Sequence, residues 1–174
     1  MATAARLTEA EQADFGQIVR EHQSMVFSIA YHFLCDRAVA EEVAQDVFLR
    51  LFESRDKLES PEHVKHWLRR TTTNRCIDSC RRRKFMPRVG LDDIPEPSVP
   101  AGVGDPMLSR MLRQLVASLP ERWRALIILK YQEDMETDEI AEALDMPAGT
   151  VKSQLSRALG FLREKALRLV GEVQ

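Results

Sequence analysis

Four polar residues near the C-terminus have the types and spacing expected of a helix that reads DNA. Lys152, Ser153, Ser156 and Arg157 fall on one side of a helix starting near residue 148, and the apolar residues fall on the other. A major groove admits one α-helix, whose early residues reach base edges while lysine and arginine also bind phosphates. The pattern predicts DNA binding by this face, in preference to an ordinary solvated helix.

A second group of basic side chains lies in residues 61–84, PEHVKHWLRRTTTNRCIDSCRRRK, which are predicted to form one long helix. Its C-terminal half carries positive charge on several faces, so we expect part of it to contact nucleic-acid phosphates. Asn74 is the side chain best suited to hydrogen-bond a base edge. The basic residues that cover these faces are Arg69, Arg70, Arg75 and the run from Arg81 to Lys84.

Two histidines and two cysteines in the same helix raise the question of a metal site. His63 and His66 are separated from Cys76 and Cys80 by about ten residues, or roughly 15 Å of helix, which is too far for one ion. We expect no metal and no cofactor, and we interpret Cys76 and Cys80 as small core residues. A thiol-based redox role for the pair is the alternative.

The sequence does not indicate an enzyme. It has no glycine-rich phosphate-binding loop and no Ser-His-Asp arrangement within a supporting motif. Its aspartates and glutamates are scattered over charged helix faces, with no carboxylate pair in an apolar setting. We therefore expect a binding protein without catalytic residues.

The sequence predicts that these side chains are carried by helices. Apolar residues recur at intervals of three and four, and no stretch alternates with strand period. Ser60-Pro61 and Asp105-Pro106 each predict a helix start, and Thr137 predicts another N-cap. Residues 137–144 and the helix from 148, joined by a tight turn, fit a helix-turn-helix. The expected fold class is all-α.

Proline and charge divide the chain into two small helical domains, 1–85 and 107–174. Residues 86–106 contain five prolines and three glycines, which predict an extended, mobile linker. Each domain holds one basic island: residues 61–90 have nine Lys and Arg against two Asp and Glu, and residues 147–174 have five against two. The whole chain has a formal net charge of −2, so this segregation indicates two separate surfaces for a polyanion.

The helix before the basic one offers a different kind of surface. In DRAVAEEVAQDVFLRLF, residues 36–52, the apolar side consists of Val43, Val47 and Leu51. The remaining face is mixed in charge and polarity, which suits a protein partner better than DNA. Taken alone, it is more simply interpreted as an ordinary solvated face. Its outward residues are Gln45, Asp46, Leu49, Arg50 and Glu53.

Neither membrane insertion nor secretion is indicated. No window approaches the about 18 apolar residues of a membrane span, and the N-terminal residues lack the pattern of a signal peptide. The three cysteines, Cys35, Cys76 and Cys80, cannot all pair and are expected to be reduced. We expect a cytoplasmic protein with no membrane contact of its own.

In their order along the chain, these segments resemble the bacterial extracytoplasmic-function (ECF) sigma factors, a compact two-domain group of sigma factors. DRAVAEEVAQDVFLRLF is similar to the segment with which that family grips the clamp helices of the largest RNA polymerase subunit. HWLRRTTTNRCIDSCRRRK is similar to its promoter-melting helix in region 2. LPERWRALIILKYQEDMETDEIAEALDMPAGTVKSQLSRAL is similar to its −35-reading domain, region 4. The resemblance covers about residues 12–85 and 108–168.

The resemblance implies a transcription initiation factor that binds core RNA polymerase, recognises the −10 and −35 elements of promoter DNA and promotes DNA opening. It implies a polymerase contact at Gln45, Asp46 and Leu49. It also implies a flipped −10 base at Asn74 with the loop around 58–63, phosphates near Arg69, Arg70, Arg81 and Arg82, and a −35 contact at Lys152, Ser153 and Arg157. An anti-sigma factor is a further partner implied by the family.

Two features depart from the family pattern, and one alternative function remains. Thr71-Thr72-Thr73 and the cysteines Cys76 and Cys80 stand where small apolar residues are usual, and β-branched threonine lowers helix propensity. The alternative is a free-standing helix-turn-helix transcriptional regulator. It accounts for the C-terminal domain but gives no role to the N-terminal basic helix.

Overall fold

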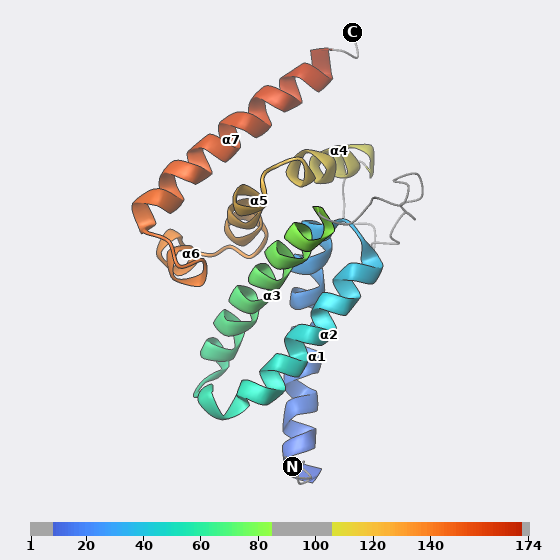
Figure 1. The fold of residues 1–174 in the computed structure, drawn as a ribbon, viewed down its shortest axis with the longest axis vertical. Helices are drawn as coiled ribbons and strands as arrows, with labels where there is room; N and C mark the ends of the chain where they lie inside the picture. Colours follow the sequence, from blue (N-terminus) through green and yellow to red (C-terminus); the bar gives the residue numbers. More distant parts are fainter. Residues whose placement is uncertain (1–8, 85–105, 172–174) are drawn as a thin grey trace.

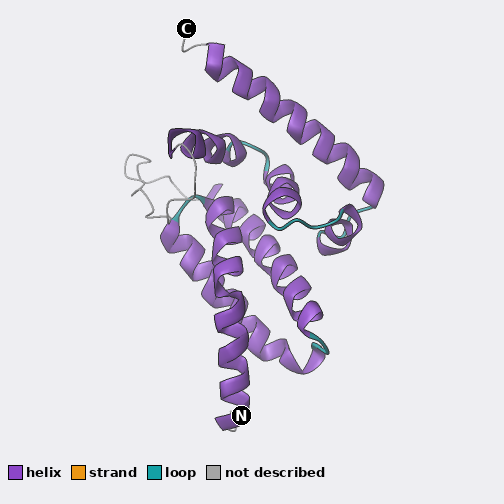
Figure 2. Ribbon diagram, turned by 180° about the vertical axis from the view of Figure 1, so that it is seen from behind, coloured by secondary structure: helices purple, strands orange, loops and turns teal. Residues whose placement is uncertain are grey.

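The chain is helical throughout the part that the structure describes. The computed structural model describes residues 9–84 and 106–171, and every regular element within these ranges is a helix, which confirms the all-α class (Figure 1, Figure 2). The elements are α1 Glu9–Leu34, α2 Arg37–Ser54, a 3-10 turn Arg55–Lys57, α3 Pro61–Lys84, α4 Pro106–Ala117, α5 Glu121–Ile127, a π-helix Ile128–Gln132, α6 Thr137–Ala143 and α7 Ala148–Gly171.

The helices group as the domain division predicts, although its boundaries stay a prediction. Helices α1–α3 fall within the predicted domain 1–85, and α4–α7 begin at Pro106 and fall otherwise within 107–174. The predicted linker 86–106 lies, apart from Pro106, outside the described residues. Among the helices that are described, none is both long and apolar enough to cross a membrane.

Helices α1, α2 and α3 form a bundle around one apolar core. Its centre is made by Ile29 and Phe33 of α1, Val47 and Leu51 of α2, and Leu68 of α3, each at most 1% exposed. Members of each pair are one helical turn apart, so each helix presents a single apolar stripe to the bundle. The apolar side predicted for the helix before the basic one is thereby confirmed.

Polar contacts and one backbone turn determine where α2 and α3 begin in this bundle. The Ser60 hydroxyl accepts a hydrogen bond from the His63 N–H at 3.1 Å, and α3 begins at Pro61, as predicted. The Asp36 carboxylate accepts one from the Val39 N–H at 3.1 Å at the start of α2. Cys35, between α1 and α2, has a φ of 54°, a left-handed conformation that allows the chain to reverse within two residues.

The predicted helix-turn-helix encloses the second core. Leu126 of α5, Ile140 of α6 and Val151 of α7 are fully buried against one another. The turn between α6 and α7 contains Asp145 with a φ of 52°, and the Met146 N–H bonds to the Ala141 carbonyl oxygen at 2.8 Å. The geometry of this motif agrees with the sequence prediction.

The N-cap of α6 is one residue earlier than predicted. Thr137 is the first helical residue, and the capping residue is Glu136, with φ −72° and ψ 156°. The Glu139 carboxylate accepts a hydrogen bond from the Glu136 N–H at 2.6 Å. The carboxylate of the third helical residue thus turns back to the cap, as in a capping box, and its charge also favours the helix N-terminus.

The two halves of the molecule pack against each other. Helix α5 lies against α3, and the π-helix lies against α1, with Ala125 and Ile128 belonging to the core of the N-terminal bundle (Figure 1). The guanidinium of Arg124 donates to the carbonyl oxygen of Phe33 at 2.7 Å and to that of Leu119 at 3.1 Å. The sequence predicted two domains but no interface between them.

Replacing Leu68 with alanine is expected to lower the free energy of unfolding by about 2–5 kcal/mol, because a fully buried side chain is lost from the middle of α3. Urea denaturation followed by circular dichroism measures the change. The matched control is Leu49→Ala at a side chain that is 65% exposed, where we expect a change within about 0.5 kcal/mol. Equal losses in both variants would contradict the assigned core.

Candidate nucleic-acid and polymerase interfaces

The predicted DNA-reading face of α7 is fully available. Lys152, Ser153, Ser156 and Arg157 are all exposed, while Val151, Leu155 and Ala158 of the same turns are buried. The four residues occupy the first three turns of the helix, where a major groove is normally entered. The structure therefore places them as the sequence predicted, and neither Lys152 nor Arg157 forms an ion pair with another of the described residues.

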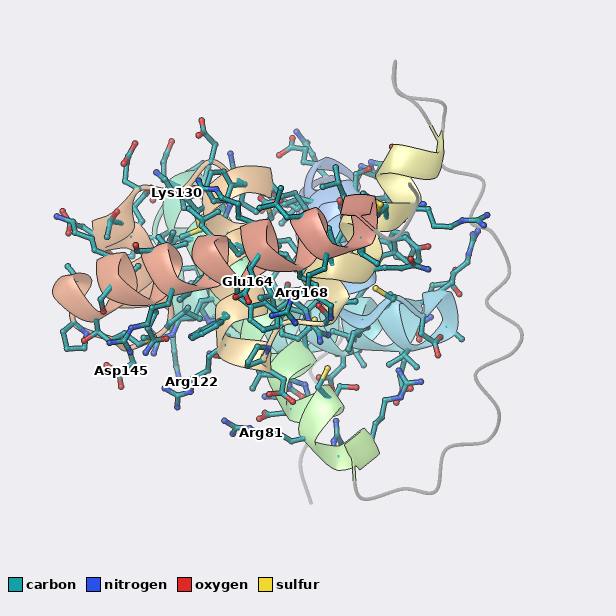
Figure 3. The ribbon with its side chains drawn as sticks, turned by 90° about the horizontal axis from the view of Figure 1, so that it is seen from above. Arg81, Arg122, Lys130, Asp145, Glu164 and Arg168 are labelled. Carbon is teal, nitrogen blue, oxygen red and sulfur yellow. The ribbon has the colours of Figure 1, made fainter. Side chains whose placement is uncertain are left out.

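The predicted DNA face of α3 is exposed along one line. Arg70, Asn74 and Arg81 fall within about 40° of one another at 100° per residue, and all three are exposed. Arg82 is exposed beside them. Arg81 extends from the C-terminal part of α3 away from the body of the molecule (Figure 3). This side of α3 offers positive charge and one amide to a nucleic acid.

Arg69 is the exception among the residues assigned to DNA. Its Nε donates to the Glu133 carboxylate at 3.1 Å, and its Nη2 donates to the Glu133 backbone oxygen at 2.9 Å. The two side chains are only 15% and 7% exposed, because they lie between the domains. In this arrangement Arg69 is not open to a phosphate.

Two of the three threonines that depart from the family pattern are buried in the protein, and Thr71 is half-buried. Thr72 and Thr73 are at most 1% exposed, and the Thr72 hydroxyl donates to the Leu68 carbonyl oxygen at 2.6 Å. Threonine in a helix commonly satisfies its hydroxyl in this way. Helix α3 runs unbroken through this stretch, so the lower propensity of threonine does not interrupt it.

A groove of about 950 Å³ between α1 and α2 contains part of the predicted polymerase contact. Gln45 and Leu49 line it, together with a set of aromatic side chains that the sequence prediction missed. These are Phe15, Phe27, Phe48 and Phe52. Their signal in the sequence is weak, because only Phe48 and Phe52 are one helical turn apart, and the other two come from α1.

Asp46 and Arg50 are engaged within the protein. Arg50 Nε donates to the Asp46 carboxylate at 3.1 Å, and the same carboxylate forms an ion pair with Arg75 of α3. Asp46 is therefore placed to fix α2 against α3. Of the residues predicted to contact polymerase, Gln45 and Leu49 are the two that line the groove.

The cysteines lie close to Arg124 and are all free thiols. Cys76 is fully buried, and burial raises its pKa far above the ordinary thiol value, so it packs as a neutral side chain. Burial also raises the pKa of Cys35, while Cys80 Sγ lies 3.9 Å from Arg124 Nη1. Cys76 and Cys80 both pack in the N-terminal core, as interpreted from the sequence. Within the described ranges, no group of three or more His, Cys, Asp or Glu residues is arranged to hold a metal ion.

Comparison with known families matches both domains. The model for Sigma-70 region 2 matches residues 18–85, which include the basic face of α3 and all of the groove lining except Phe15. The model for Sigma-70, region 4 matches residues 109–162, which include the helix-turn-helix. The region 2 match disfavours a free-standing helix-turn-helix regulator, because such a protein has no need of this domain.

Two curated relatives match this chain over nearly the whole of both sequences, and a solved structure shares its fold. The ECF RNA polymerase sigma factor SigW of Bacillus subtilis is 28% identical, over 92% of both chains. The ECF RNA polymerase sigma factor SigL of Mycobacterium tuberculosis is 30% identical, over 94% of both. The solved sigma factor RpoE of Bartonella quintana has the same fold, with a TM-score of 0.70 at 23% identity over 87% of this chain and 95% of that one.

The two family matches follow one another in the order of the two cores, and the similarity to SigL and SigW extends over nearly the whole chain. The resemblance noted in the sequence is therefore confirmed. The chain belongs to the ECF sigma factors, the RNA polymerase sigma factors that combine Sigma-70 regions 2 and 4.

Proposed function

We propose that this sigma factor binds core RNA polymerase through the α1–α2 groove and promoter DNA through the exposed faces of α3 and α7. The observation that carries the proposal is that one chain presents two separate basic helix faces and an apolar groove at its surface. The protein has no catalytic residues of its own and works in the cytoplasm, where the polymerase is found.

The α3 face is proposed to contact the −10 element and to assist opening. Arg70, Arg81 and Arg82 hold phosphates of the opened strand, and Asn74 hydrogen-bonds a base turned out of the stack. Extracting a base costs a few kcal/mol, which contacts to the flipped base offset. Because these contacts form only with the opened strand, they favour melting of the duplex.

The α7 face is proposed to read the −35 element in the duplex. Lys152, Ser153, Ser156 and Arg157 enter the major groove, where base edges present a distinct pattern for each base pair. The basic side chains also contact phosphates, which fix the register of the helix. Sequence specificity is thus divided between a duplex reader on α7 and a single-strand reader on α3.

The groove is proposed to receive the clamp helices of the largest polymerase subunit. Its phenylalanines provide an apolar floor, and Leu49 stands exposed at its edge, ready to be buried by a partner helix. Gln45 adds a hydrogen-bonding group at the same place, and Asp46 and Arg50 lie next to it. An amphipathic helix in an apolar groove is a common mode of protein recognition.

An anti-sigma factor is proposed as a second protein partner. The Bartonella quintana sigma factor was solved with the anti-sigma factor NepR, and CnrH, which shares this fold at a TM-score of 0.63, was solved with the cytosolic domain of CnrY. We infer that a protein of this class holds the present chain inactive. The exposed apolar surface at Leu49 is available to it when polymerase is absent.

Run-off transcription from a promoter-enriched genomic library, with core polymerase in the presence and absence of this protein, tests the proposed function. New start sites preceded by a shared two-part motif are the expected result. Specific duplex binding by the protein without any new start sites would contradict it.

Leu49→Ala is expected to weaken binding to core polymerase roughly 10-fold or more, because an exposed leucine that is buried on association contributes about 1.5–3 kcal/mol. Fluorescence anisotropy of the labelled sigma factor, titrated with core polymerase, measures the affinity. Leu112→Ala is the matched control, since Leu112 is 53% exposed on α4 and does not line the groove. The contact is misassigned if the two variants bind equally.

Asn74→Ala is expected to reduce promoter opening by about 10-fold or more while the closed complex still forms, because the lost hydrogen bonds exist only with a flipped base. Permanganate reactivity of unpaired thymines reports opening, and gel shift reports the closed complex. Asp78→Ala, one turn further along the exposed side of α3, is the control and should retain opening. Parallel loss of both complexes in the Asn74 variant would argue against a melting role.

Arg157→Ala is expected to cost about 1–3 kcal/mol in binding to the selected −35 duplex and to relax the preference for one base pair. Competition binding against single-base variants of that duplex measures both quantities. Arg163→Ala is the control, because Arg163 is also exposed on α7 but lies about 9 Å further along the helix axis. It should leave base preference unchanged, and an equal loss of preference would contradict the assignment.

A further inference from the structure

The segment between α5 and α6 is the least regular part of the C-terminal domain. Ile128–Gln132 is a π-helix, closed by a hydrogen bond from the Glu133 N–H to the Ile128 carbonyl oxygen at 3.1 Å. Asp134 follows with a φ of 51°. Lys130, labelled in Figure 3, donates to the Met135 carbonyl oxygen at 3.1 Å and braces the segment. Such π-turns are rare and occur frequently at functional sites.

This segment directs two consecutive polar side chains at the N-terminal domain. Gln132 Nε2 donates to the Ser28 hydroxyl of α1 at 3.1 Å. Glu133 accepts two hydrogen bonds from Arg69, one from Nε on its carboxylate and one from Nη2 on its backbone oxygen. The Glu133 side chain is only 7% exposed and that of Arg69 only 15%. The pair is therefore largely shielded from solvent, unlike an ordinary surface ion pair. The π-turn therefore positions a carboxylate on an arginine of the DNA-contacting helix.

We propose that Glu133 is an internal substitute for a DNA phosphate, which occupies Arg69 and holds the two domains closed until nucleic acid displaces it. The proposal rests on the proposed function and adds to it a phosphate contact of the −10 region at Arg69, which forms only once Glu133 has released this side chain. The guanidinium fork pairs with a carboxylate or a phosphate through the same kind of charged hydrogen bonds, so the two anions compete for it. The apparent affinity for DNA is then the affinity of the open form multiplied by the fraction of molecules that are open, so closure lowers it.

The closed arrangement also covers part of the DNA-contacting helix. Helices α5 and α6 cover one side of α3, next to the exposed line of Arg70, Asn74 and Arg81. Separation of the domains would free Arg69 and uncover that side of the helix at the same time. The ion pair therefore couples the accessibility of the −10 surface to the position of the −35 domain.

Charge reversal of each partner tests the lock in the full chain. In Glu133→Lys, two cations face each other, and we expect small-angle X-ray scattering to show a shift to a larger radius of gyration. The double variant Arg69→Glu/Glu133→Lys restores an opposite pair and should return the radius toward that of the wild type. Glu142→Lys carries the same charge change at an exposed position on α6 and should leave the radius unchanged.

DNA binding tests the inhibitory role. With a fluorescein-labelled single-stranded oligonucleotide of mixed sequence, Glu133→Lys should bind about 3- to 10-fold more tightly than Glu142→Lys, because the open fraction rises while the net charge is the same. Circular dichroism of each variant confirms that its helices have formed.

The outcomes separate the lock from the proposed function. An unchanged radius in Glu133→Lys, or a double variant that stays expanded or unfolds, overturns the lock. Expansion with equal DNA affinity of the two lysine variants overturns the inhibitory role alone. If the wild type supports no promoter-dependent transcription with core polymerase, the proposed function fails, whatever the scattering shows.

Discussion

The guanidinium of Arg124 holds the ends of two helices that belong to different domains. It donates to the carbonyl oxygens of Phe33, near the end of α1, and of Ala117, at the end of α4, and it lies 5.2 Å from the centre of the Phe33 ring. Carbonyl groups in the last turn of a helix lack partners within the helix, and they carry the negative end of its dipole. A largely buried cation is tolerated here because it receives several such acceptors.

The packing of the two domains around Arg124 determines which side of α3 is covered and which stays exposed. Leu68 and Cys76 pack in the bundle, Arg69 faces the C-terminal domain, and Arg70 and Asn74 face outward. A helix has a limited circumference, so a second domain packed on one side leaves a narrow line for ligands. The basic residues of α3 therefore have three roles. Arg70 binds DNA in the proposed function, Arg75 fixes α2 through Asp46, and Arg69 joins the domains.

The short-range features of both candidate sites could be predicted from the sequence. The exposure of Lys152 and Arg157 on α7 and of Asn74 on α3 depends on helical periodicity, which is a local property. The cap at Ser60 depends on the next three residues in the same way. The aromatic groove could not be predicted to the same extent, because Phe15 and Phe48 are brought together by the packing of α1 on α2. The π-turn at Ile128–Gln132 also escaped prediction, since its apolar residues have ordinary helical spacing.

An all-α chain, a helix-turn-helix, two basic surfaces and the sigma-factor family could all be predicted from the sequence, because periodicity, turn residues and motif order are local properties of the chain. Which of the basic residues are free depends instead on how the domains pack. Arg69 and Arg70 are adjacent and chemically identical, yet one is bound to Glu133, which is 64 residues away, and the other is exposed. The reason is physical: an ion pair depends on the distance between charges in space, which the separation of residues in sequence does not fix.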